Sequence, residues 1–268
     1  MKKVSLNITN DDPQVVAFFE VADKTYDAFH KTLSAIIPIP QSGRRQISLH
    51  RLTIYHGTLF DETVFSVPQL VLLDAPRIAS LANRQAFEYS VRIRYMHKHD
   101  EEAESLLDSL HWRVSKEADN AGAHFSPELR KGYAAHFKEW RDNHPELESM
   151  YQEGRLIEMA RDVLGNKFDS QFFQFYAYPS ILAHGKPHGI IDVLQLLEPN
   201  GAAVKHQWES VTVDGLSELS KIVFLTIDLL EFLTRTYGLD MSPVIDLNDK
   251  HRRVQSQFGY SDSQGGAQ

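Results

Sequence analysis

The stretch GLSELSKIVFLTIDLLEFLTRTYG, residues 215–238, decides the class of fold, because it is the most apolar helical segment of the chain. Its large apolar residues surround most of a helix: Ile222, Val223, Phe224, Leu225, Ile227, Leu229, Leu230, Phe232 and Leu233. Such a helix lies at the centre of a core or at an interface, and a chain of 268 residues can bury it in its own core. We therefore expect a central helix that ends at Gly238.

Helical patterns also occupy most of the remaining chain. Residues 12–36 have apolar side chains at helical spacing. Residues 74–97 contain no glycine, and we expect Asp74 to cap this helix and Pro76 to stand in its first turn. Further helices are expected at 100–119, 126–140, 145–152 and 155–165, whereas residues 44–65 are compatible with a helix or a strand. The predicted fold class is mainly α, with a single helical bundle.

Two short segments predict a minor two-stranded β element, and the end of the chain predicts a tail. KVSLNIT (3–9) alternates apolar and polar residues, and HQWESVTVD (206–214) is compatible with a partner strand. The chain has no internal repeat and no obvious linker, so residues 1–240 are predicted to form one helical domain. Residues 241–268 end in a polar sequence rich in Gly, Ser and Gln, and we expect them to be mobile.

The composition excludes several classes of function. A formal net charge of −8 disfavours a protein that binds nucleic acid by general attraction to phosphate. The locally basic sequence RIRYMHKH (92–99) fits a phosphate site, but it also fits the C-terminal end of a helix. The absence of cysteine excludes disulfides and thiol nucleophiles. No apolar run suggests a membrane span or a signal peptide, so we expect a cytoplasmic protein without membrane contact.

Two of the expected helices carry a polar stripe. Arg84, Glu88 and Arg92 are spaced by four residues and share one helical face. The second stripe lies in YAYPSILAHGKPHG (176–189) and consists of Tyr176, Ser180 and His184. If the two faces meet, Glu88 can accept a hydrogen bond from Ser180 or His184, and the arginines can hold Glu88 ionised. The pattern leaves open whether the stripes form a catalytic site or a buried network that fixes the packing of two helices.

The combination of an Arg-x-x-x-Glu helix with a later Tyr-x-x-x-Ser-x-x-x-His segment resembles a bacterial helical family of unknown function. That family is in turn similar to HEPN-type and abortive-infection proteins, and the resemblance covers roughly residues 45–235 in the order of elements. HEPN ribonucleases carry an Arg-x(4–6)-His motif at a helix end, usually completed across a dimer. In this chain, Arg92 with His97 or His99, and Arg94 with His99, have that spacing.

The resemblance implies a metal-independent ribonuclease of phage defence or of a toxin–antitoxin pair, with RNA as substrate and a homodimer as the assembly. A histidine would exchange the proton of the RNA 2′-hydroxyl, and an arginine would stabilise charge on the phosphate. His184 or His97 would be the acid and base. Arg84 and Arg92 would contact the phosphate, and Glu88 would orient them.

A second interpretation is a non-catalytic helical module that binds a protein partner or dimerises, with the polar stripes in a structural role. No phosphate-binding glycine loop, nucleophile elbow, calcium loop or His-Glu-x-x-His motif occurs in the sequence. The histidines also lack the Glu-x-x-His spacing of di-iron bundles. We therefore expect neither a cofactor nor a bound metal.

Overall fold

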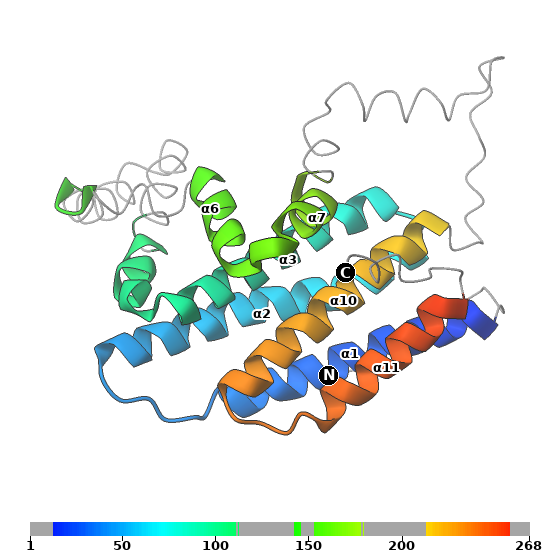
Figure 1. Cartoon of the computed structure of the whole chain (residues 1–268), viewed down its shortest axis with the longest axis horizontal. Coiled ribbons are helices and arrows are strands. Elements are labelled where there is room, and N and C mark those ends of the chain that lie inside the picture. Colours follow the sequence, from blue (N-terminus) through cyan, green and yellow to red (C-terminus); the bar gives the residue numbers. More distant parts are fainter. Residues whose placement is uncertain are drawn as a thin grey trace, which may run out of the picture. The chain divides into compact units, whose positions relative to one another are not determined.

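The structure is a computed structural model that describes residues 13–110, 112, 142–145, 153–177, 179 and 213–257. Seven α-helices have both of their ends within these residues, and no β-strand occurs there. Figure 1 shows their arrangement. They are α1 (Pro13–Ile36), α2 (Arg44–Leu72), α3 (Pro76–Lys98), α6 (Glu153–Leu164), α7 (Phe168–Phe172), α10 (Val213–Thr236) and α11 (Ser242–Gln257). Short 3₁₀ turns form η1 (Asp100–Glu102) and η3 (Gly165–Lys167), and a π-helical turn forms η4 (Phe173–Ala177). The mainly α prediction is confirmed.

The chain divides into two compact units. The first unit consists of Met1–Ile39, Gly57–Ser90 and Asp169–Gln268, and the second of Pro40–His56 and Val91–Phe168. Helices α2 and α3 contribute residues to both units. The single domain over residues 1–240 stays a prediction.

Helix α10 occupies the core of the first unit, as its sequence predicts. It packs against α1 and α11, and the three helices lie side by side (Figure 1). Leu219, Ile222, Leu229 and Leu233 are at most 1% exposed, so α10 is covered on several faces. Phe224 is the exception in this helix, with 39% of its surface exposed. Burial of so many large apolar side chains is the main favourable term in folding this unit.

Helix α2 settles the choice between helix and strand for residues 44–65. It continues as a helix to Leu72 and includes Pro68, which cannot donate a hydrogen bond to the carbonyl one turn earlier. Gly57 marks a close approach to α1, because a Cβ atom built at this position would lie 2.8 Å from Cδ1 of Leu33. Leu33 is buried, so the absence of a side chain at Gly57 makes room for it.

The prediction of a mobile tail from residue 241 is wrong for residues 242–257. These residues form α11, which packs against α1 and α10. Val244, Leu247, His251 and Val254 are buried and recur at intervals of three or four residues, which places them on one helical face. The high polar content of the segment hides this short apolar stripe.

The predicted cap at Asp74 is also wrong, because Asp74 closes the preceding helix instead of opening α3. Its φ of 51° is left-handed, and the amide of Ala75 donates to the Leu70 carbonyl at 2.9 Å. The amide of Asp74 itself donates to Val71. This pattern is a Schellman motif at the C-terminus of α2. Gly238, with a φ of 65°, ends α10 in the same way and confirms the predicted stop.

Several predictions fall outside the described residues. They are the strand at 3–9, residues 206–212 of the strand at 206–214, the helix at 126–140, most of the helix at 145–152, and the tail after residue 257. The last two residues of the strand predicted at 206–214 are helical instead, because α10 begins at Val213. Of the helix expected at 100–119, residues 103–110 are described and are helical.

Candidate functional site

Arg84 joins the two predicted polar stripes within the first unit. Its Nε donates to Glu88 Oε1 at 3.2 Å, and its Nη2 donates to the Tyr176 hydroxyl at 3.1 Å. The guanidinium carbon also lies 4.4 Å from the centre of the Tyr176 ring, within the range of a cation–π contact. We call these three residues the arginine seam. The Arg84–Glu88 face of α3 therefore meets η4 at Tyr176, a contact that the sequence leaves open.

The arginine seam is largely removed from solvent. The Arg84 and Glu88 side chains are 19% and 23% exposed, and Tyr176 is 4% exposed. Glu88 and Tyr176 thus fix the guanidinium in one orientation, while part of its surface stays accessible. A cation held in this way can bind an anion without first being reorganised.

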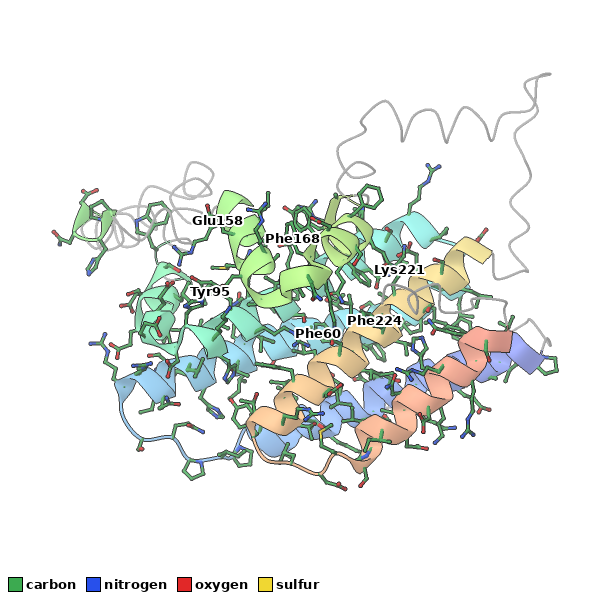
Figure 2. All side chains as sticks on the ribbon, viewed as in Figure 1. Phe60, Tyr95, Glu158, Phe168, Lys221 and Phe224 are labelled. Carbon is green, nitrogen blue, oxygen red and sulfur yellow. The ribbon has the colours of Figure 1, made fainter. Side chains whose placement is uncertain are left out.

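A row of aromatic rings supports the seam from inside the first unit. Tyr176 stacks on Phe172 with ring centres 4.8 Å apart, and Phe87 stacks on Phe175 at 5.8 Å. Phe175 in turn stacks on Phe224 of α10, whose side chain Figure 2 labels. The π-helical turn η4 lets the adjacent residues Phe175 and Tyr176 both be buried.

The other predicted site residues have different positions. Ser180 and His184 lie outside the described residues, so their contacts with Glu88 stay predictions. Arg92 lies two turns after Arg84 on α3 and belongs to the second unit. His97 also belongs to the second unit, near the C-terminal end of α3, which is where the Arg-x(4–6)-His motif is expected.

His97 is poorly suited to donate a proton. Its Nε2 lies 3.0 Å from the Thr53 hydroxyl, and burial lowers the pKa of its imidazole to about 4. A histidine with this pKa is neutral at pH 7 and is only a weak base. The geometry therefore favours a structural role for His97, in which it links α3 to α2 inside the second unit.

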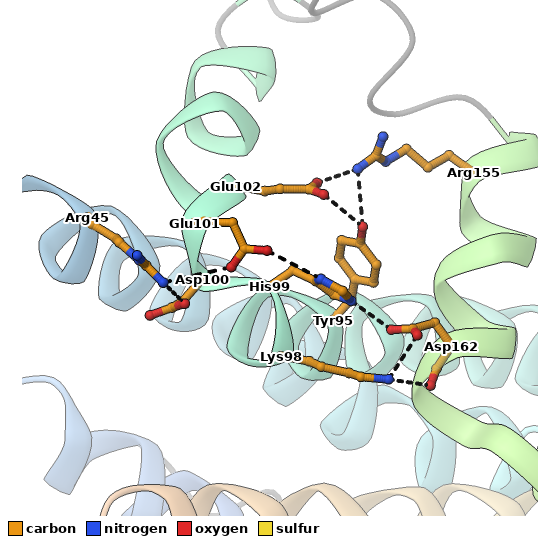
Figure 3. A network of polar contacts seen from close by, with 9 residues as sticks. All are labelled: Arg45, Tyr95, Lys98, His99, Asp100, Glu101, Glu102, Arg155 and Asp162. Atoms are coloured by element: carbon orange, nitrogen blue, oxygen red, sulfur yellow. Dashed lines mark hydrogen bonds and ion pairs between the residues drawn. The ribbon is translucent and has the colours of Figure 1, made fainter.

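A polar network at the end of α3 was not predicted from the sequence. Its members belong to the second unit and join α3 and η1 to α6: Tyr95, Lys98, His99, Glu102, Arg155 and Asp162 (Figure 3). We call this group the α6 network. The Tyr95 hydroxyl donates to Glu102 at 3.1 Å, and Arg155 donates to both Glu102 and Tyr95.

Asp162 of α6 is the acceptor for the other half of the network. Lys98 Nζ lies 2.8 Å from its Oδ1, and His99 Nε2 lies 2.8 Å from its Oδ2. The hydrogen bonds from Lys98 and then from His99 lower the pKa of the Asp162 carboxyl. Glu101 lies 3.5 Å from the other ring nitrogen of His99. His99 belongs to the Arg-x(4–6)-His motif, and these contacts orient its ring between the carboxylates of Asp162 and Glu101.

The cations of this region are matched by acids. Arg45 pairs with Asp100 and Glu101, as Figure 3 shows, and this hydrogen bond from Arg45 lowers the pKa of Asp100. A phosphate would have to compete with these carboxylates for every cation drawn in the network. The sequence contains one signal for the two network residues that lie on α6. Arg155 and Asp162 are seven residues apart, so they share a face of this amphipathic helix.

Among the described residues, no group of three or more His, Cys, Asp or Glu side chains is placed to hold a metal ion. No helix in the same part of the chain has the length and apolar character needed to cross a membrane. No family model, curated protein or solved structure matches the chain.

Proposed function

We propose that the protein is a helical effector that cleaves RNA without a metal and that Arg84 binds the scissile phosphate. The observation that supports this proposal is the Arg84 guanidinium, which is oriented by Glu88 and Tyr176 and is still partly accessible. A guanidinium presents planar, paired donors that match phosphate oxygens. Arg84 belongs to the Arg-x-x-x-Glu pattern that resembles a helical family of unknown function. The similarity of that family to HEPN-type proteins is the reason to choose phosphodiester chemistry.

In this mechanism the RNA 2′-oxygen attacks the adjacent phosphorus, and the bond from phosphorus to the 5′-oxygen breaks. A base accepts the 2′-hydroxyl proton, and an acid protonates the departing 5′-oxygen. The products are a 2′,3′-cyclic phosphate and a 5′-hydroxyl. Arg84 stabilises the charge that grows on the phosphoryl oxygens, and Glu88 positions Arg84. His184 is the proposed base and acid, and the proposed roles of Ser180 and Arg92 rest on the sequence pattern alone.

The test is an RNA-cleavage assay on the purified chain in the presence of EDTA. Wild type should cleave single-stranded RNA, and His184→Ala and Arg84→Ala should each reduce the rate by roughly 100-fold or more. Arg84→Lys should keep the charge but lose the paired donors, so its activity should be intermediate. Arg235→Ala is a matched control, because Arg235 also bonds a glutamate one turn away but is 68% exposed. Equal cleavage by wild type and His184→Ala would remove His184 from the mechanism.

The cellular role proposed with this activity is phage defence or toxicity in a toxin–antitoxin pair. Expression of the wild-type chain should then slow growth, and His184→Ala should relieve the effect. A homodimer is part of the same proposal, and sedimentation at several protein concentrations measures it.

A second candidate function is a non-catalytic helical module that binds a protein partner. Mutual pairing favours it, because Glu88 and Tyr176 already use two nitrogen atoms of Arg84. On this reading, Arg84→Ala lowers the stability of the chain, and wild type shows no cleavage of RNA. The cleavage assay and a thermal unfolding curve on the same samples separate the two candidates.

A further inference from the structure

A second cluster of buried polar side chains lies in the first unit, away from any proposed catalytic role. Asn83 of α3 is 1% exposed, and its amide nitrogen donates to Glu218 of α10 twice. The acceptors are the Glu218 backbone oxygen at 2.9 Å and its Oε2 at 2.7 Å. Lys221, labelled in Figure 2, pairs with the same carboxylate at 2.5 Å.

Two buried atoms of this region have no hydrogen-bond partner among the described residues. They are Oδ1 of Asn83 and Oγ of Ser80, which is 2% exposed. Both partners of the Asn83 side-chain nitrogen are hydrogen-bond acceptors. A flip of the amide would place its oxygen against these two acceptors, so exchanging nitrogen and oxygen cannot give the oxygen a partner. Ser80 and Asn83 are three residues apart on α3, which places them next to each other on one helical face. Buried polar atoms of this kind usually bond to a ligand or an internal water.

The charges of the cluster decide what kind of molecule fits. The carboxylate of Glu218 is already matched by Lys221, so a metal ion or an ammonium group would leave an unbalanced buried charge. Asn83 Oδ1 needs a hydrogen-bond donor, and Ser80 Oγ can either donate or accept. The partner must therefore be neutral, able to donate, and small enough for a site sealed from solvent.

We propose that α3 binds an internal water molecule between Ser80 Oγ and Asn83 Oδ1, and that this water belongs to the Asn83–Glu218–Lys221 cluster. The water donates one hydrogen bond to Asn83 Oδ1 and exchanges another with Ser80. The cluster then has its buried polar atoms paired, as folded proteins require.

A high-resolution crystal structure and one substitution test the proposal together. We expect electron density for a single water within hydrogen-bond distance of both atoms. Ser80→Ala should lower the urea midpoint of unfolding, because it removes a bonded hydroxyl and leaves the water with one partner fewer. Ser34→Ala is the matched control for the helix propensity of alanine, because Ser34 is exposed on α1.

Two results would overturn the proposal. If the Ser80 hydroxyl has no partner, its removal raises the urea midpoint by more than the Ser34→Ala control does, and no density is found. Density for a larger molecule, with a bound compound released on denaturation and detected by mass spectrometry, would replace the water by a small polar ligand. The RNA-cleavage assay is independent of both results, because Ser80 has no part in the proposed cleavage.

Discussion

The arginine seam of the first unit and the α6 network of the second unit hold helices together by different physics. The seam has one cation, two partners and a support of stacked aromatic rings, and little of it is exposed. The α6 network has more charges, but Lys98 is 52% exposed and Asp162 is 36% exposed. Water and salt screen such pairs, and their net contribution to stability is small. The number of ion pairs in a region is thus a poor guide to how firmly that region is held.

The largest effect should come from the aromatic support of the seam. Phe175→Ala removes a ring that is 2% exposed and stacked on Phe87, and we expect a loss of about 3–5 kcal/mol in the free energy of unfolding. Phe173→Ala is the control, because Phe173 lies in the same π-helical turn but is 60% exposed. Urea denaturation measures both, and equal losses would contradict the ring packing described for η4.

Buried histidines should make both units sensitive to acid. Burial lowers the pKa of His251 in the first unit and of His97 in the second to about 4. Unfolded histidine binds a proton below about pH 6.5, but these folded side chains do not until about pH 4. Stability is therefore lost as the pH falls through this window, by at most roughly 3.5 kcal/mol for each group at 1.4 kcal/mol per pKa unit.

His251→Gln and His97→Gln should each flatten the pH dependence of the urea midpoint between about pH 7 and pH 4. His30→Gln is the control, because the His30 side chain is 46% exposed. A pH profile that stays as steep as that of the wild type in both buried variants would show that other groups cause the acid sensitivity.

Double-mutant cycles should rank the two polar clusters directly. The cycle of Arg84→Met with Tyr176→Phe should give a coupling energy of about 1–3 kcal/mol, because the hydrogen bond is charged and partly buried. The cycle of Lys98→Ala with Asp162→Ala should give roughly 0.2–1 kcal/mol and should weaken as salt is added. A larger coupling in the α6 network, unchanged by salt, would reverse the comparison.

The two Schellman motifs should also give small effects, of about 1 kcal/mol or less. Gly238→Ala touches no neighbour, since nothing lies within 4 Å of its added Cβ, and it should cost about 1 kcal/mol through the left-handed φ alone. Asp74→Gly relieves the left-handed φ but also removes the aspartate side chain and its interactions, so its effect should be smaller than that of Gly238→Ala. Thermal unfolding curves measure both, and a loss of stability in Asp74→Gly would assign a structural role to the carboxylate.

The sequence was sufficient for elements whose own periodicity defines them. Helix α10 and its stop at Gly238 follow from an apolar run and one residue type. The polar composition of residues 242–257 does not predict helix α11, although Val244, Leu247 and Val254 have helical spacing, because packing on α1 and α10 outweighs that composition. Asp74 was misassigned, because aspartate suits both a helix start and a left-handed helix end.

The sequence predicts parts of the candidate site only where residues recur at a spacing of four, either within one helix or as two such polar stripes. Arg84 with Glu88 follows from their separation of four residues. The second stripe singles out Tyr176, but its hydrogen bond with Arg84 comes from the structure alone. The α6 network pairs residues of α3 with Asp162, more than 60 residues away, and spacing carries no information on such a contact.

The close approach at Gly57 has a consequence for how this protein can evolve. A methyl group at this position would meet Cδ1 of Leu33, so the Leu33 side chain would have to shift, and substitutions at positions 33 and 57 should be coupled. A lineage that acquires alanine at position 57 should carry a smaller residue at position 33, and the two changes should be inherited together. Leu33→Ala is expected to make Gly57→Ala tolerable, and the order in which the two arise would decide which intermediates natural selection removes.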